Sequence, residues 1–144
     1  MKPDNRISHF LHRHHVLTLA TVSANKPWCA NCFYVYLEEE NCLAFTSDLD
    51  TKHITDTQEQ KIVAGSVVLE TKIIGKIQGI QFRGIIEEPE GLFYKQVKVA
   101  YLKRFPVAVL MDTTMWVVRL QYIKMTDNWL GFGKKIIWSS GDPI

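Results

Sequence analysis

The sequence predicts a mostly β protein with short helices, in which six or seven antiparallel strands form a Greek-key barrel or sandwich. Runs rich in β-branched and aromatic residues recur along the chain, and turn residues separate most of them after short intervals. Helical spacing of apolar residues is confined to short segments, whereas a parallel α/β sheet would require more helices. The 144 residues and 47% hydrophobic content suffice for one domain, residues 1–144, and leave no room for a second.

A short helix and three antiparallel strands are expected first. Residues 7–13 can form the helix, and the β-branched run 16–22 predicts a strand that stops at the turn 24–27. Strand-forming residues resume over 28–37, are interrupted by an acidic turn, and return over 42–46.

A second helix and two more strands follow. Asp50 or Thr51 can cap a helix that runs to about residue 60, because their side-chain oxygens accept hydrogen bonds from free N–H groups of the first turn. Strand signals then return at 62–70 and 79–88.

Residues 90–105 are predicted to form a helix with one buried face. The apolar residues that recur at helical spacing are Phe93, Val97, Ala100, Tyr101 and Phe105. An acid at the start and two bases near the end match the helix dipole, and Pro106 terminates the helix. The last predicted strands are 115–125 and 136–138.

Charge and composition exclude several classes of function. Seventeen Lys and Arg against 15 Asp and Glu leave a formal net charge of +2, too small and too evenly spread for a nucleic-acid surface. No uncharged run approaches the ~20 residues that cross a bilayer, and the first residues lack the apolar stretch of a secretion signal. Three cysteines, an odd number, form no closed disulfide framework and agree with a reducing compartment. We expect a cytoplasmic protein that binds neither nucleic acid nor a membrane.

The Trp-Cys-x-x-Cys segment at 28–32 is similar to the redox centre of thioredoxins. In that centre the first cysteine lies at a helix N-terminus, whereas here the residues after Cys32 continue as strand. Residues three apart in a strand face opposite sides, and their Cα atoms would be ~10 Å apart, beyond disulfide reach. No second cysteine or histidine pair completes a four-ligand zinc site. A redox or zinc role for Cys29 and Cys32 is therefore the less favoured interpretation.

Four histidines, His9, His12, His14 and His15, lie near the N-terminus. His9 and His12 can share one helix face, but two ligands make a weak metal site. No carboxylate or cysteine stands at matching spacing nearby, so we interpret these residues as a solvated helix end and predict no metal site.

Residues 45–53 have the composition of a phosphate site. A strand runs into hydroxyls and bases at a helix start, where backbone N–H groups and the helix dipole favour an anion. Ser47 and Thr51 can donate hydroxyl hydrogen bonds, and Lys52 supplies a compact charge. An ordinary capping turn is the alternative, since the carboxylate of Asp48 or Asp50 can occupy the same pocket and repel a phosphate. The local residues leave both interpretations open.

The strand within 79–88 alternates in character. The residues expected to face the core are Ile80, Phe82, Gly84 and Ile86. Gln81 and Arg83 then point outward together, where they can pair with acids at a subunit contact or donate to a ligand. Gly84 fits either the close approach of another backbone or a bend.

Trp28, Tyr34 and Tyr36 are expected to share the outer face of the second strand, and such a face is more apolar than contact with water favours. A self-complementary dimer contact is the default explanation. An interfacial cleft is also a common place for a planar cofactor.

Several segments carry a resemblance to a known family. The looser ones are 19–22, the Pro27-Trp28 turn exit, Phe45-Thr46 leading to Thr51-Lys52-His53, and 80–84. The more specific ones are 28–31, 104–108 and 126–128 followed by 130–135. With the order of elements, the first set resembles the FMN-binding split β-barrel superfamily, whose name-giving member is pyridoxamine 5′-phosphate oxidase. The second set resembles its functionally uncharacterised YhbP-like branch.

This resemblance implies a homodimeric split barrel that holds one FMN per subunit in a groove at the interface. The residues at the phosphate would be Ser47, Thr51, Lys52 and His53. The isoalloxazine ring would lie along Ala30, Asn31 and Cys32. Gln81 and Arg83 would approach the polar edge of the ring or the ribityl chain.

The chain departs from the oxidase pattern at two places. Pyridoxamine phosphate oxidases present an Arg-Lys pair to the phosphate, whereas this chain offers Lys52-His53. A neutral histidine donates one hydrogen bond and brings no full charge, so we expect a modest affinity for FMN. The oxidase also holds its substrate with late arginines, and no arginine follows Arg119 here, so oxidation of pyridoxamine phosphate is unsupported.

The leading hypothesis is therefore an FMN-binding homodimer of the oxidoreductase type, with no residue assigned as a catalytic acid or base and an unknown substrate. The alternative is a cofactor-free, non-enzymatic dimeric module that binds another planar or anionic ligand.

Mild oxidation of the folded protein is expected to leave Cys29 and Cys32 unpaired, because the two side chains face opposite sides of a strand. Titration of free thiols before and after oxidation measures this directly. An intramolecular Cys29–Cys32 bond in the folded protein would contradict the strand interpretation.

Overall fold

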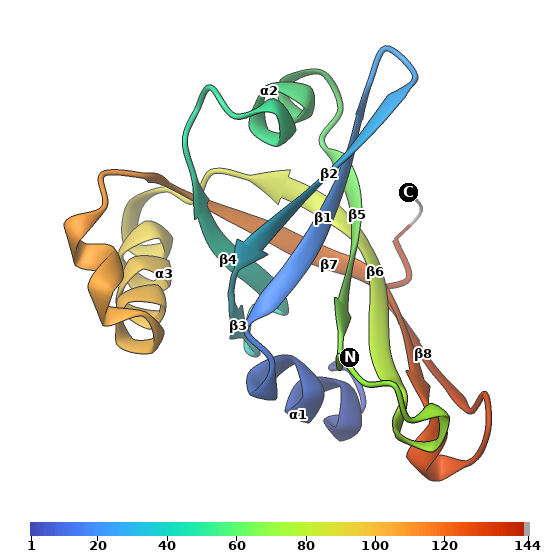
Figure 1. The fold of residues 1–144 in the computed structure, drawn as a ribbon. Helices are drawn as coiled ribbons and strands as arrows, with labels where there is room; N and C mark the ends of the chain where they lie inside the picture. Colours follow the sequence, from blue (N-terminus) through green and yellow to red (C-terminus); the bar gives the residue numbers. More distant parts are fainter. Residues whose placement is uncertain (143–144) are drawn as a thin grey trace.

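A computed structural model describes residues 1–142, which form an eight-stranded antiparallel sheet curled into a half-barrel with three α-helices (Figure 1). In chain order the elements are α1 (Asn5–Arg13), β1 (Val16–Ser23), β2 (Lys26–Phe33), β3 (Val35–Leu37), β4 (Cys42–Ser47), α2 (Lys52–Glu59), β5 (Ile62–Val68), the 3-10 turn η1 (Ile74–Lys76), β6 (Gln78–Glu87), α3 (Gly91–Arg104), η2 (Pro106–Leu110), β7 (Thr114–Asp127), η3 (Asn128–Leu130) and β8 (Lys135–Ser139). Within this described part of the chain, no helix is both long and apolar enough to span a bilayer.

The predicted elements are present, with one strand more than the sequence indicated. Their order in the sheet is β2-β1-β5-β6-β7-β4-β3, and β8 pairs with β7. The segment expected as a single strand over 28–37 is divided at Tyr34 into β2 and β3, which are the two ends of that order. Because β2 and β3 are consecutive in the chain but lie at opposite ends of the strand order, the sheet has to curl to bring these two strands together.

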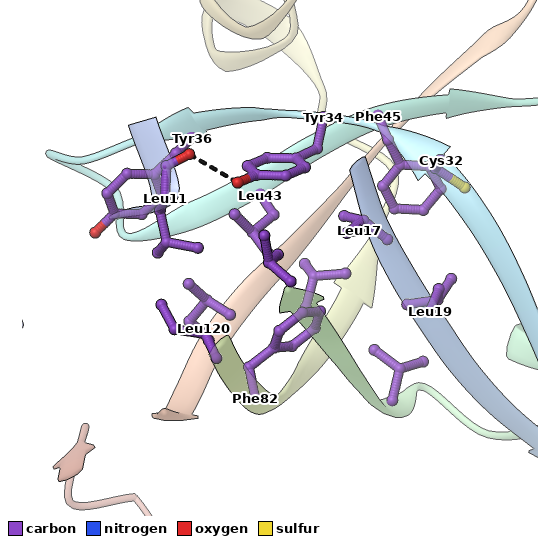
Figure 2. Packing of buried hydrophobic residues seen from close by; sticks show 14 of the residues in the cluster. Leu11, Leu17, Leu19, Cys32, Tyr34, Tyr36, Leu43, Phe45, Phe82 and Leu120 are labelled. Atoms are coloured by element: carbon purple, nitrogen blue, oxygen red, sulfur yellow. Dashed lines mark hydrogen bonds between the residues drawn. The ribbon is translucent and has the colours of Figure 1, made fainter. Parts of the chain in front are cut away.

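Tyr34 is fully buried at this division, and three contacts fix it there. Its hydroxyl donates to the Leu11 carbonyl at 2.7 Å (Figure 2), and its backbone N–H donates to the His15 carbonyl at 2.9 Å. The guanidinium carbon of Arg104 lies 5.6 Å from the ring centroid. Burial raises the pKa of the Tyr34 phenol, so the hydroxyl remains a donor.

The prediction that three aromatic residues share the outer face of the second strand is wrong. Trp28 pairs with Thr21, and the even-numbered residues of β2 lie beside the inward-facing residues of β1. Tyr34 and Tyr36 continue that inward side and are 0% and 3% exposed, whereas Trp28, at the open end of the strand, is 49% exposed. The alternation was assigned correctly but to the opposite side, because the apolar rings fill the core.

Two hydrophobic clusters lie on the two sides of the sheet. The inner cluster fills the barrel; α1 contributes Ile7, Phe10 and Leu11, and α2 contributes Ile54. Figure 1 shows these two helices at opposite ends of the barrel and α3 against its outer side. In the outer cluster, Val97 and Tyr101 of α3 cover β3, β4 and the first part of β7, as the helical spacing predicted.

The alternation predicted for β6 is confirmed: the four residues expected in the core are buried, and Gln81 and Arg83 are exposed. Gly84 lies both at a close approach of another backbone and at an irregularity of the strand, the two alternatives given for it. A Cβ atom there would lie 2.3 Å from the Arg119 carbonyl oxygen, and the register between β6 and β7 shifts between Arg83 and Gly84.

Replacing Tyr34 with Phe is expected to lower the free energy of unfolding by about 1–3 kcal/mol, because the Leu11 carbonyl loses its donor inside the protein. Urea unfolding measures the loss. The matched control is Tyr94→Phe on the exposed side of α3, which should change little. Equal effects of the two substitutions would contradict the role given to the Tyr34 hydroxyl.

Candidate functional site

The start of α2 brings together side chains from three elements. Ser47 ends β4, and its Oγ shares a hydrogen bond of 2.7 Å with Nε2 of His53 in the first turn of the helix. The Sγ atom of Cys32, on the inward side of β2, lies 4.0 Å from the same Oγ. Trp116 Nε1 donates to the Ser47 carbonyl at 3.1 Å and fixes the end of the strand. Three of the predicted site residues therefore form one cluster.

Burial sets the chemical state of this cluster. It lowers the pKa of His53, so the imidazole is neutral near pH 7 and donates through one nitrogen only. It also raises the pKa of the Cys32 thiol, which keeps the sulfur protonated and a poor nucleophile. The cluster can offer neutral hydrogen bonds to a ligand and has no activated thiolate.

Lys52 lies beside these residues but already has a partner. Its Nζ forms an ion pair with the carboxylate of Asp56, one helical turn further on. Thr21 Oγ1 donates to the other carboxylate oxygen at 2.9 Å. Asp56 is only 3% exposed, and the hydrogen bond from Lys52 is the main reason why its pKa is lowered. The charge of Lys52 is therefore partly neutralised before any anion arrives.

Thr51 occupies the N-cap position of α2 without capping it. Its side chain makes no capping hydrogen bond and instead donates from Oγ1 to the Asp48 carbonyl at 2.8 Å. The position predicted from the sequence was correct, but the expected acceptor role was not, because the hydroxyl turns back to its own loop. Asp48 and Asp50 are exposed.

The three residues predicted along the flavin ring lie on two faces of β2. Ala30 and Cys32 pair with Leu19 and Leu17 and face inward. Asn31 faces outward, where Thr18 Oγ1 donates to its Oδ1 at 2.9 Å. The structure thus joins Cys32 to the α2 cluster, places Ala30 on the same inward side of β2 and separates Asn31 from both.

Gln81 and Arg83 lie far from this cluster within one subunit. Both are exposed on the outer face of β6, three strands from β2, a distance of about 14 Å at the usual spacing between strands. The Arg83 guanidinium carbon lies 5.9 Å from the centroid of the Tyr122 ring.

The cysteines of the Trp-Cys-x-x-Cys segment and the N-terminal histidines lie apart from the α2 cluster, with the exception of Cys32. Cys29, Cys32 and Cys42 are free, with Cys29 exposed and the other two buried. Within residues 1–142, no group of three or more His, Cys, Asp or Glu side chains is placed to hold a metal ion. The fold does bring one distant carboxylate to the histidines: Glu38 Oε2 lies 3.1 Å from His12 Nε2.

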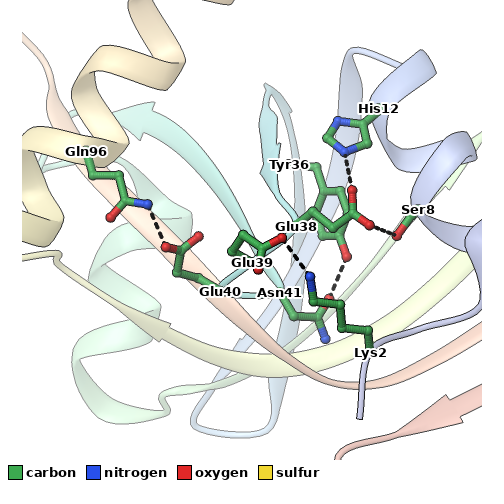
Figure 3. A network of polar contacts seen from close by, with 9 residues as sticks. All are labelled: Lys2, Ser8, His12, Tyr36, Glu38, Glu39, Glu40, Asn41 and Gln96. Atoms are coloured by element: carbon green, nitrogen blue, oxygen red, sulfur yellow. Dashed lines mark hydrogen bonds and ion pairs between the residues drawn. The ribbon is translucent and has the colours of Figure 1, made fainter.

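This contact belongs to a polar network around the turn between β3 and β4 (Figure 3). Glu38 also accepts from Ser8, Glu39 accepts from Lys2 at 2.6 Å, and Glu40 accepts from Gln96 at 2.6 Å. The acidic turn expected only to interrupt the strands therefore ties α1 and the N-terminus to α3.

Asp56 and Thr21 were missed by the sequence analysis. Asp56 stands four residues after Lys52, a spacing at which helical side chains meet, so this signal was available. The partner of Thr21 comes from helix α2 and that of Arg83 from the paired strand β7, and neither contact between distant segments can be read from the sequence.

The half-barrel and its helices define the class of protein. A heme-binding protein from Mycobacterium smegmatis has a TM-score of 0.78 and 18% sequence identity, over 96% of this chain and 59% of its own. A FAD-binding protein from Mesorhizobium loti gives 0.70 and 15%, over 84% and 91%. The heme storage protein HutZ from Vibrio cholerae gives 0.66 and 17%, over 96% and 95%. These likenesses show a split-barrel fold that flavin-binding and heme-binding proteins share.

Sequence comparison gives the family. No protein-family model matches the chain. A UPF0306 protein from Photorhabdus laumondii is 44% identical over 132 residues, which cover 92% of each chain, and one from Yersinia pseudotuberculosis is 40% identical over 138 residues. The chain belongs to the UPF0306 family.

The ion pair of Asp56 is expected to make stability depend on pH. Because folding lowers the pKa of this carboxyl from its ordinary value of 3.8, the stabilisation is present above that pH and is lost as the pH falls through the folded value. Lys52→Met should be less stable than the wild type at pH 7, and the difference should shrink below about pH 4 as Asp56 takes up its proton.

Urea unfolding between pH 3 and pH 7 measures this difference. Lys95→Met is the control, because Lys95 is exposed and takes part in none of the ion pairs within residues 1–142. If the difference in the free energy of unfolding between Lys52→Met and the wild type stays constant across this range, Lys52 does not act through the charge of Asp56.

Proposed function

We propose that this protein binds FMN at the interface of a homodimer and belongs to the oxidoreductases. The observation that carries the proposal is the cluster at the start of α2. Ser47 and His53 lie at a helix N-terminus whose cap residue, Thr51, offers its free N–H groups no side-chain acceptor. Such a terminus favours a phosphate through its N–H groups and its dipole. The structural similarity to a FAD-binding protein supports the proposal.

The residues of the cluster can bind the phosphate of FMN, but only one of them, Lys52, carries a positive charge. Ser47 and His53 would bind it by hydrogen bonds, and Lys52 would supply a positive charge that it shares with Asp56. Affinity should therefore be modest, as expected from the Lys52-His53 pair. When bound, FMN supplies one- and two-electron transfer chemistry, and the protein supplies position and dielectric.

Ala30 and Cys32 would contact the flavin ring from the inward side of β2. Ala30 is small and half-buried, and Cys32 presents an uncharged thiol, so both leave room for a planar ring near an edge strand. Trp28, two residues before Ala30 on the same side, is 49% exposed at the open end of the strand. These residues orient the ring and exclude water, and none of them acts as an acid or a base.

A homodimer would complete the site. Gln81 and Arg83 lie on the opposite face of the sheet, so only a second copy can bring such side chains to a flavin at β2. We propose that the contact includes the exposed apolar residues of η2, its C-cap residue and the end of β2, because monomers rarely expose such patches. These residues are Phe33, Val107, Val109, Leu110 and Met111, exposed by 59%, 74%, 69%, 83% and 58%.

A dimeric binding module without catalysis is the second candidate, and the observation in its favour is the likeness to heme-binding proteins. Heme is a planar, anionic ligand of the kind this module would take. The two candidates differ in the ligand that they predict, so parallel titrations with FMN and with hemin separate them.

FMN added to the purified protein is expected to lose fluorescence in a saturable way, with a dissociation constant below about 100 μM. Ser47→Ala and His53→Ala should each weaken binding by about tenfold or more, because each removes a hydrogen bond to a charged phosphate. Ser23→Ala, on the neighbouring strand β1, is the matched control. Light scattering of the same samples should give two subunits per particle.

Hemin is titrated in parallel. No saturable response to FMN up to about 100 μM, a weak-binding regime, would defeat the flavin proposal. Saturable binding of hemin by protein that does not bind FMN would favour the second candidate. A monomer that binds FMN with the affinity stated above would contradict the interfacial site.

A further inference from the structure

A pocket of about 230 Å³ lies where α1 covers one end of the barrel, opposite to the end that α2 covers (Figure 1). Its walls are one face of α1, the first residue of β6 and the last residues of β7. Sites for drug-sized ligands have volumes of about 300–1,000 Å³, so this pocket is suited to a smaller molecule. The FMN proposal uses none of the residues that line it.

The bottom of the pocket combines one polar side chain with an apolar wall. Asp127 lines the pocket and is only 5% exposed. Phe10 of α1 and Met125 of β7 line it as well, and both are buried. A ligand in this pocket therefore meets a buried carboxylate and an apolar surface side by side.

Asp127 keeps one carboxylate oxygen for the pocket. Its Oδ1 accepts from the backbone N–H of Trp129 at 3.0 Å and from Nε2 of Gln78 at 3.2 Å. Within residues 1–142, no hydrogen bond or ion pair uses Oδ2 of Asp127, and none uses Oε1 of Gln78. A buried carboxylate needs donors, and a primary ammonium brings three N–H donors with a balancing charge.

Arg6 also lines the pocket, but it is already paired. Its Nε and Nη2 donate to the two carboxylate oxygens of Asp4, each at 3.0 Å. This pair is the main reason why the pKa of Arg6 is raised, and the charge of Asp127 adds a smaller effect. Asp127 therefore lies at the end of the pocket near Arg6, and it takes part in none of the ion pairs of the described chain.

A cation without a partner lies at the other end of the pocket. Arg13 is exposed and stands seven residues after Arg6 on the same helix face, about 10 Å further along the axis. Its side chain enters none of the hydrogen bonds or ion pairs within residues 1–142. Helical side chains lean toward the N-terminus, so the guanidinium extends back over the pocket, where it can bind a carboxylate by two parallel hydrogen bonds.

The two ends of the pocket thus have opposite charge, with apolar side chains between them. Phe10 stands between Arg6 and Arg13 in the helix and separates the two ends. A ligand that satisfies both ends carries a positive and a negative group joined by an apolar segment.

We propose that this pocket binds a small zwitterion in which a primary ammonium and a carboxylate are separated by a short aliphatic chain, as in an ω-amino acid. The ammonium donates to Oδ2 of Asp127 and Oε1 of Gln78, and the carboxylate accepts from Arg13. The chain packs against Phe10 and Met125. This goes beyond the proposed function, because it requires neither a flavin nor a second copy of the protein.

Four probes test the proposal in calorimetric titrations of the full chain. 6-Aminohexanoate should bind in a saturable way, with a dissociation constant below about 1 mM. Hexanoate lacks the ammonium and hexylamine lacks the carboxylate, so each should bind about tenfold more weakly. Glycine carries both charges on one carbon and cannot reach both ends of the pocket, so it should also bind about tenfold more weakly.

Two substitutions assign each charged group of the ligand to one end of the pocket. Asp127→Asn should weaken the binding of 6-aminohexanoate about tenfold and remove its advantage over hexanoate. Arg13→Met should weaken it similarly and remove its advantage over hexylamine. Lys95→Met on α3, which removes an exposed positive charge elsewhere, should change nothing. Thermal unfolding establishes that each variant folds, and Arg13→Met alters only an exposed side chain.

The proposal is overturned if 6-aminohexanoate shows no saturable binding up to about 10 mM, a very weak regime. Equal affinities for 6-aminohexanoate, hexanoate and hexylamine would overturn it too, as would an unchanged affinity for 6-aminohexanoate in Arg13→Met. Failure here is distinct from failure of the FMN proposal, which is read from Ser47→Ala and His53→Ala at the other end of the barrel.

Discussion

The burial of one tyrosine between two strands sets the shape of the whole sheet. Tyr34 turns the chain from β2 into β3. Its hydroxyl donates to the carbonyl of Leu11 in α1, and its N–H donates to the carbonyl of His15, the residue before β1. Because β2 and β3 are the two ends of the strand order, this turn makes the sheet curl. The same turn leaves β2 as an edge strand whose inward side faces the start of α2, which is why Cys32 meets Ser47.

Coverage of the sheet explains where ligands can bind. The strands β3, β4 and the first part of β7 are buried on both faces, inward by the barrel core and outward by α3. The remaining strands are covered on one face only. A buried polar group needs a partner, so hydrogen-bonding side chains available to a ligand are left at the edge near α2 and on the open outer face. The α2 cluster occupies the first of these places.

Local patterns predicted the elements because they depend on neighbours in the chain. The burial of Val97 and Tyr101, and the exposure of Gln81 and Arg83, follow from helical and strand periodicity. The side of β2 that carries Trp28 was assigned wrongly, since periodicity gives two faces without saying which is inside. The i, i+4 spacing of Lys52 and Asp56 can be read from the sequence, whereas the contacts of His53 with Ser47 and of Asp56 with Thr21 join separate elements. The sequence could therefore predict Ser47, Lys52 and His53 but not the contact with Thr21.

The position of β7 in the sheet has a consequence for synthesis on the ribosome. This strand pairs with β6 along most of its length, with β4 through its first half and with β8 through its second. A nascent chain that has not yet reached residue 114 therefore leaves the edges of β4 and β6 unpaired, although most of its core residues are already made. Exposed strand edges promote association between chains, so the sheet is open to such association until β7 has been made and has paired with both strands.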